Sequence, residues 1–365
     1  MNTNNRIKNF DFLRGLFLIF ALQQHFTYYI NMWFVEYFHD GAGLKSTFGI
    51  YYPVIGKQIK ADYLTMLFDF IFTPWVSQIY ITMAMFNLAK YKSQELRDKL
   101  PTKLRLYFYI VIFFVLENFI VAPNFGQAIS IYPIVLWMII LSGTAIVYGL
   151  FGIRLIYISL IGSVLLLLNP ITNYSDYFQI IMQLNFHGGF EYDARFEYFL
   201  TSGLLGFVFG HAYFHDAKIK YSYFILIGFC MLLIYKFFGE IYHQNPYDVL
   251  MHEHDLIKNF PGLMYILGMQ LVTLLTFLYL ENKKIFIKLP AINWVGENSI
   301  LVFGLHRIIF TKLVLPISIF IGVLFERKIE ANFIEVYFYI AITLLIIFAI
   351  NYLELYKVVF RGADK

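Results

Sequence analysis

Three ionisable side chains are spaced to share one face of the first apolar segment. Asp11, Arg14 and His25 lie within the stretch RIKNFDFLRGLFLIFALQQHF. Arg14 and His25 are eleven residues apart. A helix would therefore place both on one face, separated by roughly 16 Å along its axis. Charged groups at membrane depth are costly and usually face a bundle interior or a water-filled cavity. The spacing predicts a candidate site rather than a simple anchor.

These residue types suit proton transfer and anion binding. A neutral imidazole at His25 can accept a proton from a hydroxyl or amine nucleophile. Arg14 could hold a phosphate or a carboxylate through two parallel hydrogen bonds. The alternative is structural: Asp11 and Arg14 pair at i, i+3, and His25 hydrogen-bonds a neighbouring group. The residues alone leave both interpretations open.

A second acid-bearing segment is LTMLFDFIFTPWVSQIYI, which contains Asp69. An acid inside a membrane span needs a partner, and a carboxylate can orient a histidine and stabilise its imidazolium form. The alternative is an interfacial acid near the entrance of the helix. His39 lies just after the first apolar segment, beside Asp40 and Gly41, and is a further candidate.

The late segment NWVGENSILVFGLHRIIF carries a third group of candidates. Ser299 and His306 are seven residues apart and so share a helix face. His306 and Arg307 lie within an apolar run and should face the bundle interior. We expect these residues, with the neighbouring Asn298, to contact a substrate, or else to form a packing contact with the first helix.

Basic residues gather in the loop that contains Lys103 and Arg105. They could bind the phosphates of a cytosolic donor such as coenzyme A. The positive-inside rule predicts such loops in any polytopic protein, and on topology alone it is the favoured explanation. The HEH sequence at 252–254 does not put both imidazoles on one helix face, and no HExxH motif occurs, so we expect no metal.

The composition indicates a membrane protein. Of the 365 residues, 59% are hydrophobic and only 14% are charged, a balance that excludes a soluble domain. Aromatic residues make up 20%, as expected for interfacial belts. The single cysteine, Cys230, excludes intrachain disulfides and multi-cysteine metal sites. The bilayer is thus an expected partner, and nucleic acid is not.

Ten apolar segments could each cross a bilayer, which requires about 20 residues. They lie near 12–30, 64–89, 104–122, 129–150, 153–170, 198–214, 221–238, 261–280, 297–325 and 331–353. Gly152 to Arg154 separates two of them, and Pro316 is expected to kink or divide the ninth. We expect an all-α integral membrane protein, a polytopic bundle of about ten transmembrane helices, forming one domain over 1–365. The first segment is long enough to span and lacks a cleavage site, so we expect it to be retained.

The distribution of lysine and arginine predicts the orientation. With the N-terminus in the cytosol, most of them fall in cytosolic loops, and most acids fall on the opposite face. We therefore expect both termini to be cytosolic and the protein to reside in the plasma (inner) membrane. The long far-side loops, about 31–62, 171–197 and 239–260, are rich in Tyr, His, Asp and Gly, which suits polar ligands such as sugars.

The chain resembles the transmembrane acyltransferases, the group of acyltransferase-3 and heparan-α-glucosaminide N-acetyltransferase-like proteins. Their first helix begins with an Arg, followed by Asp-x-x-Arg-Gly and an apolar run ending in His or Asn. The corresponding residues here are Arg6, Asp11, Arg14, Gly15 and His25. The second element is matched by Asp69, Pro74 and Trp75, and the late Gly-x-Asn-Ser…His element by Gly296, Asn298, Ser299 and His306.

The resemblance implies transfer of an acyl group from cytosolic acetyl-CoA, or another acyl-CoA, to a glycan hydroxyl or amine on the far side. It implies that Arg14, with Asp11, lies on the donor side and that His25 is the general base. Asp69 would support or orient that base. His39 is the nearest match to a loop histidine used by the N-acetyltransferase branch. Lys103 and Arg105 correspond loosely to an Arg-rich element of the third helix.

Two other functions remain open. A proton-coupled transporter or exporter of a glycan or lipid-linked substrate would use the intramembrane Asp, Arg and His as a proton relay. A degenerate acyltransferase fold could act as a sensor or partner subunit. The acceptor, the acyl chain and any homo-oligomer stay undetermined at this point.

Overall fold

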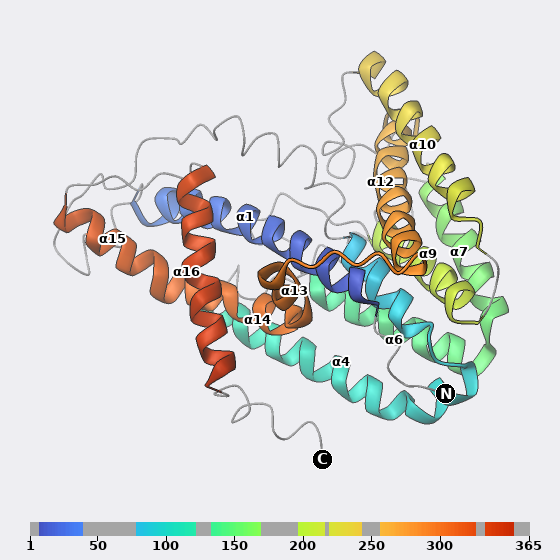
Figure 1. Cartoon of the computed structure of the whole chain (residues 1–365), viewed down its shortest axis with the longest axis horizontal. Coiled ribbons are helices and arrows are strands. Elements are labelled where there is room, and N and C mark those ends of the chain that lie inside the picture. The colour runs from blue at the N-terminus through green and yellow to red at the C-terminus, as the bar shows by residue number, and fades with distance from the viewer. Residues whose placement is uncertain are drawn as a thin grey trace. The chain divides into compact units, whose positions relative to one another are not determined.

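The computed structural model describes residues 7–38, 78–121, 133–168, 196–215, 219–242, 256–325 and 333–353. Every regular element in these ranges is a helix, as Figure 1 shows. The prediction of an all-α chain is confirmed for this part of the protein. The chain divides into two compact units. Unit 1 is formed by residues 1–10 and 74–288, and unit 2 by residues 11–73 and 289–365.

Unit 1 is built from paired apolar helices. It contains the helical residues 78–88 together with α4 (Ser93–Val121), α6 (Pro133–Phe151), α7 (Ile153–Leu168), α9 (Phe196–Phe214), α10 (Tyr221–Tyr242) and α12 (Leu256–Asn282). The helix α10 packs along α12, α4 along α6, and α7 along α9 (Figure 1). Glycines on α9 allow a close approach to the helical residues 78–88. The space beside Gly206 and Gly210 is filled by the backbone of Thr82 and Phe86, so no side chain fits there.

Unit 2 contains α1 (Lys8–Phe38) from Asp11 onward, α13 (Pro290–Glu297), α14 (Ser299–Ile309), the π-helical segment η1 (Phe310–Val314), α15 (Leu315–Leu324) and α16 (Phe333–Tyr352). Both α14 and η1 pack on α16. Phe26 of α1 stacks on Phe310 of η1, with ring centroids 3.8 Å apart and an angle of 7° between the ring planes. This aromatic stack joins α1 to the C-terminal helices inside unit 2.

Of the two interruptions expected from the sequence, Gly152 ends a helix and Pro316 coincides with a local change of helix type. Gly152 has φ 76° and accepts the left-handed conformation that ends α6, so α7 begins as a separate helix. Pro316 has no backbone N–H and its ring clashes with the carbonyl four residues earlier. The helix accommodates this by widening into η1 directly before the proline, without a sharp stop.

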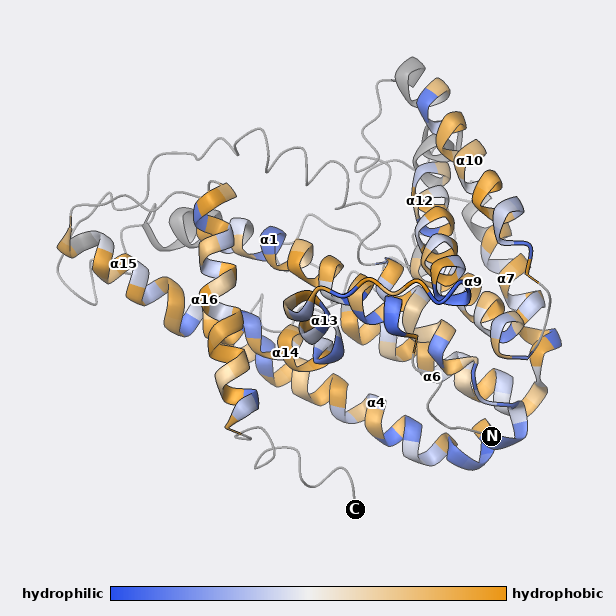
Figure 2. Ribbon diagram, viewed as in Figure 1, coloured by the Kyte–Doolittle hydropathy of each residue, from blue (hydrophilic) through white to orange (hydrophobic). Residues whose placement is uncertain are grey.

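Five of the described helical segments are long and apolar enough to cross a membrane: Ser93–Val121, Ile134–Phe151, Met264–Asn282, Ser299–Gly322 and Phe333–Tyr352. Shorter apolar helices cover Ile153–Leu165, Phe199–Phe214 and Tyr221–Phe237. Large apolar side chains are exposed along α4, α10 and α16, which suits contact with lipid tails. Figure 2 shows the same apolar character along most helices and a hydrophilic start to α4. An integral membrane protein is supported, whereas the count of ten spans stays a prediction.

Candidate functional site

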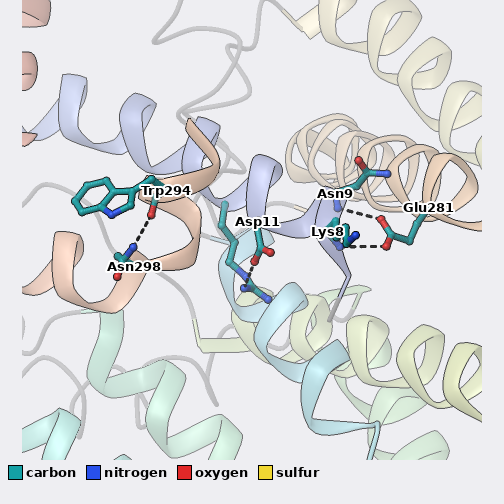
Figure 3. Close-up of polar contacts among 7 residues, drawn as sticks. Lys8, Asn9, Asp11, Glu281, Trp294 and Asn298 are labelled. Atoms are coloured by element: carbon teal, nitrogen blue, oxygen red, sulfur yellow. Dashed lines mark hydrogen bonds and ion pairs between the residues drawn. The ribbon is translucent and has the colours of Figure 1, made fainter. Parts of the chain in front are cut away.

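The start of α1 carries the predicted acid and guanidinium as an ion pair. Arg14 Nη1 lies 3.2 Å from Asp11 Oδ1, at the i, i+3 spacing expected on one helix face (Figure 3). The Asp11 side chain is buried, whereas 24% of the Arg14 side chain is exposed. The ion pair expected from the helical spacing is therefore present, and the Arg14 side chain is partly exposed.

Two of the histidines singled out in the sequence, His25 and His306, meet inside unit 2. His25 Nδ1 on α1 lies 2.8 Å from His306 Nε2 on α14, although the residues are 281 positions apart in the chain. Their rings are stacked, with centroids 5.1 Å apart and an angle of 18° between the planes. His306 is fully buried, while His25 retains some exposed surface. Of the two histidines, only His25 has exposed surface, whereas His306 is enclosed by the protein.

His306 is anchored by its own helix. Its Nδ1 lies 2.8 Å from the carbonyl oxygen of Phe303, one turn earlier on α14. A carbonyl oxygen can only accept a hydrogen bond, so His306 Nδ1 is the donor. The rings of Phe303 and Phe26 lie close to the same imidazole, with centroids 5.4 Å and 6.3 Å away. These contacts fix the orientation of the His306 ring.

A second polar contact lies beside the histidines. Arg307 Nε donates to the hydroxyl of Tyr29 at 2.5 Å, and the guanidinium lies 5.7 Å from the centre of the Tyr29 ring. Arg307 is only 3% exposed. Tyr29 is also a neighbour of His25, with ring centroids 6.3 Å apart. We call His25, Tyr29, His306 and Arg307 the dyad cluster.

Tyr29 was not among the site residues predicted from the sequence, although its position relative to His25 indicates it. Tyr29 follows His25 by four residues, so it lies on the same helix face. Glu117 was also missed. It is a buried acid within the apolar helix α4, 1% exposed, and acids in such positions are functional candidates. Glu117 belongs to unit 1 and the dyad cluster to unit 2.

Asn298 and Ser299 lie at the junction between α13 and α14. The Asn298 side chain donates from Nδ2 to the carbonyl oxygen of Trp294 at 2.9 Å, closing the end of α13 (Figure 3). Ser299 begins α14, seven residues before His306, so it lies roughly 10 Å from that residue along the axis. The observed contact of Asn298 is structural, and Ser299 is not part of the dyad cluster.

The predicted cytosolic basic residues form a separate group in unit 1. The ammonium groups of Lys90, Lys99 and Lys103 lie 5.1, 4.7 and 5.2 Å from the ring centre of Tyr91. Burial raises the pKa of the Tyr91 phenol, but the positive charges of Lys103, Lys90 and Lys99 outweigh it and lower that pKa overall. Arg105 is exposed on α4. The group has the charge expected of a surface that contacts anions.

Two predicted site residues, Asp69 and His39, lie outside the described residues. Within the described ranges, no three His, Cys, Asp or Glu side chains lie close enough together to hold a metal ion. Comparison with known proteins gives no relative from which to read a role: no protein-family model, no curated protein and no solved structure matches this chain.

Proposed function

We propose that this protein is an integral-membrane acyltransferase. It would move an acetyl or other short acyl group from cytosolic acyl-CoA to a hydroxyl or amine of an extracytoplasmic glycan. The observation that carries the proposal is the 2.8 Å contact between His25 on α1 and His306, which lies in the membrane-length apolar segment Ser299–Gly322. A hydrogen-bonded imidazole among apolar side chains supplies a proton acceptor where side chains able to act as one are rare.

The proposed reaction is direct acyl transfer. His25 takes the proton from the acceptor hydroxyl or amine as that oxygen or nitrogen attacks the thioester carbonyl. The carbon–sulfur bond then breaks, and the coenzyme A thiolate leaves and takes that proton from the His25 imidazolium, which returns to its neutral form. A positioned base typically contributes about 10²–10⁴-fold to the rate. Holding donor and acceptor in one dry site must supply the remainder.

The donor would be held by cationic groups. Arg14, oriented by Asp11, is partly exposed and can bind a phosphate or carboxylate. Lys103 and Arg105 belong to unit 1 and are proposed as a second group able to bind donor phosphates. Asp69 and His39 keep the supporting roles that the resemblance to transmembrane acyltransferases implies.

The proposal includes the topology. About ten spans with both termini in the cytosol would present donor and acceptor sites on opposite sides of the plasma (inner) membrane. Support comes from the helices themselves, since nine of the ten predicted segments overlap α1, α4, α6, α7, α9, α10, α12, α14–α15 and α16. In the remaining segment, 64–89, residues 78–88 are helical.

The test is release of free coenzyme A from acetyl-CoA by the purified protein in nanodiscs, with and without a crude cell-envelope glycan extract. His25→Gln should reduce turnover by about 10²–10⁴-fold while acetyl-CoA binding persists, because glutamine cannot accept the proton. His211→Gln in α9 is the matched control and should retain turnover. A wild-type protein that neither binds nor consumes any acyl-CoA would exclude this function.

The second candidate is a proton-coupled transporter or exporter of a glycan or lipid-linked substrate. The dyad cluster also favours this transporter function, since ionisable side chains such as His25 and His306, joined by a hydrogen bond, can pass protons through a membrane. Proteoliposomes distinguish the two candidates. A transporter would move its substrate in a manner abolished by an uncoupler and would not consume acyl-CoA.

A further inference from the structure

We propose that His306 is a positioning residue that holds His25 in the Nδ1–H tautomer and leaves His25 Nε2 as the proton acceptor. This inference rests on the proposed acyltransferase function. It gives His306 a role different from the substrate contact expected from the sequence, and it names which nitrogen of His25 takes the proton.

The contact between His306 and the carbonyl oxygen of Phe303 determines which nitrogen of His306 carries a proton. The Phe303 carbonyl oxygen, 2.8 Å from His306 Nδ1, has no proton to give. His306 Nδ1 must therefore carry one. A neutral imidazole has a single N–H, so His306 Nε2 carries a lone pair and acts as an acceptor.

The tautomer of His306 in turn determines the tautomer of His25, because the two imidazoles share a hydrogen bond. The atom 2.8 Å from His306 Nε2 is His25 Nδ1. Because His306 Nε2 accepts, His25 Nδ1 must donate. The remaining nitrogen of His25, Nε2, is then without a proton in the neutral residue. A backbone carbonyl on α14 thus sets the tautomer of a side chain on α1.

The opposite assignment would require a charged His306. An imidazolium there would donate from both nitrogens and turn His25 Nδ1 into the acceptor. That charge would lie next in sequence to the guanidinium of Arg307, and both residues are almost fully buried. Two adjacent positive charges in an apolar setting are strongly disfavoured. The neutral pair is the consistent assignment.

Burial agrees with these roles. His306 has no exposed surface, so it does not reach a substrate from its present position, whereas His25 retains some. When His25 Nε2 gains a proton, His25 Nδ1 still donates to His306 Nε2, so the pair needs no rearrangement. His306 then stabilises the imidazolium by accepting its hydrogen bond, as a carboxylate does in a catalytic triad.

The test is ¹⁵N NMR of histidine-labelled protein in nanodiscs, with the two signals assigned by loss in His25→Gln and His306→Gln. Nitrogen shifts distinguish N–H from bare ring nitrogens. We expect both residues to be protonated on Nδ1 and bare on Nε2. A wild-type His25 that is protonated on Nε2 and bare on Nδ1 would overturn the inference, whatever the activity of the protein.

Kinetics provide the second measurement. In His306→Leu the acceptor is lost, so kcat should fall by about 10²–10⁴-fold while KM for acetyl-CoA is unchanged. In His306→Gln the amide oxygen can accept from His25 Nδ1, so a substantial part of kcat should return. A loss of kcat that is equal in both variants at equal thermal stability would overturn the positioning role. Absence of any turnover in the wild type would instead overturn the proposed function, and the tautomers would still be measured.

Discussion

Gly15 on α1 and Gly296 on α13 lie backbone against backbone within unit 2. A Cβ atom added to Gly15 would lie 3.0 Å from the Gly296 nitrogen, and one added to Gly296 would lie 2.9 Å from the Gly15 nitrogen. The carbonyl groups of Ile292 and Asp11 lie closer still to these two positions. The glycine of the Asp-x-x-Arg-Gly element and the glycine of the late Gly-x-Asn-Ser element therefore pack on each other. This contact explains why neither position tolerates a side chain.

Gly15→Ala and Gly296→Ala should each destabilise the protein by about 1–3 kcal/mol, the usual cost of forcing a methyl group into a filled space. The measurement is the thermal unfolding midpoint in detergent. Gly162→Ala on α7 is the control, because a Cβ there meets nothing within 4 Å. That variant should be neutral or stabilised by up to about 1 kcal/mol through helix propensity. Equal midpoints for all three variants would contradict the close approach.

Asn9 binds the segment after α12 through both ends of its amide. Its Nδ2 donates to the Ile285 carbonyl at 2.8 Å, and its Oδ1 accepts from the Ile287 amide at 3.0 Å. Asn9 is fully buried. Asn9→Ala should therefore cost about 1–3 kcal/mol for each backbone group left without its partner.

The matched control for Asn9 is Asn282→Ala, because Asn282 is exposed at the end of α12. Unfolding in a denaturing detergent series would measure both variants. If Asn282→Ala were as destabilising as Asn9→Ala, the two hydrogen bonds would not be the cause. Figure 3 shows the neighbouring contacts, in which the Glu281 carboxylate accepts from the backbone amides of Lys8 at 3.1 Å and Asn9 at 3.0 Å.

Gln270 and Ser202 form a buried polar contact between α12 and α9, with Gln270 Nε2 donating to Ser202 Oγ at 3.0 Å. A double-mutant cycle with Gln270→Leu and Ser202→Ala should give a coupling free energy of about 0.6–2 kcal/mol, the range for such bonds between membrane helices. The same cycle with Ser159→Ala on α7 in place of Ser202→Ala should be additive, because the Ser159 hydroxyl donates to the carbonyl oxygen of Leu155 in its own helix. Additive behaviour in both cycles would show that the Gln270–Ser202 bond contributes nothing.

The lysines around Tyr91 should control its ionisation. Because positive charge lowers the pKa of Tyr91, Lys103→Met should raise that pKa, and Lys103→Arg should leave it nearly unchanged. The folded protein releases this proton before the unfolded chain does, so the contribution of Tyr91 to stability grows as alkaline pH rises through the lowered pKa. A titration of ¹³C-labelled tyrosine by NMR, with Tyr91→Phe to identify the signal, would measure it. No shift in Lys103→Met would contradict the role of the lysines.

Local sequence pattern determined the helices and their interruptions. Apolar runs of membrane length became helices because a backbone in an apolar setting must satisfy its own hydrogen bonds. Gly152 marked a helix end because it adopts a positive φ, and Pro316 marked a change of helix type because it lacks an N–H. The Asp11–Arg14 pair was also predictable, since helical spacing alone puts the two side chains together.

Tertiary structure decided everything that joins distant segments. Periodicity placed His25 and His306 each on a helix face, but no local rule states which faces meet across 281 positions. Tyr29 became part of the cluster only because Arg307 of α14 reaches it. The Asn9 contacts and the Gly15–Gly296 approach arise in the same way, since they depend on how helices pack and not on how each helix forms. The sequence by itself thus determined which side chains are of types able to do chemistry, and packing decided which of them lie together.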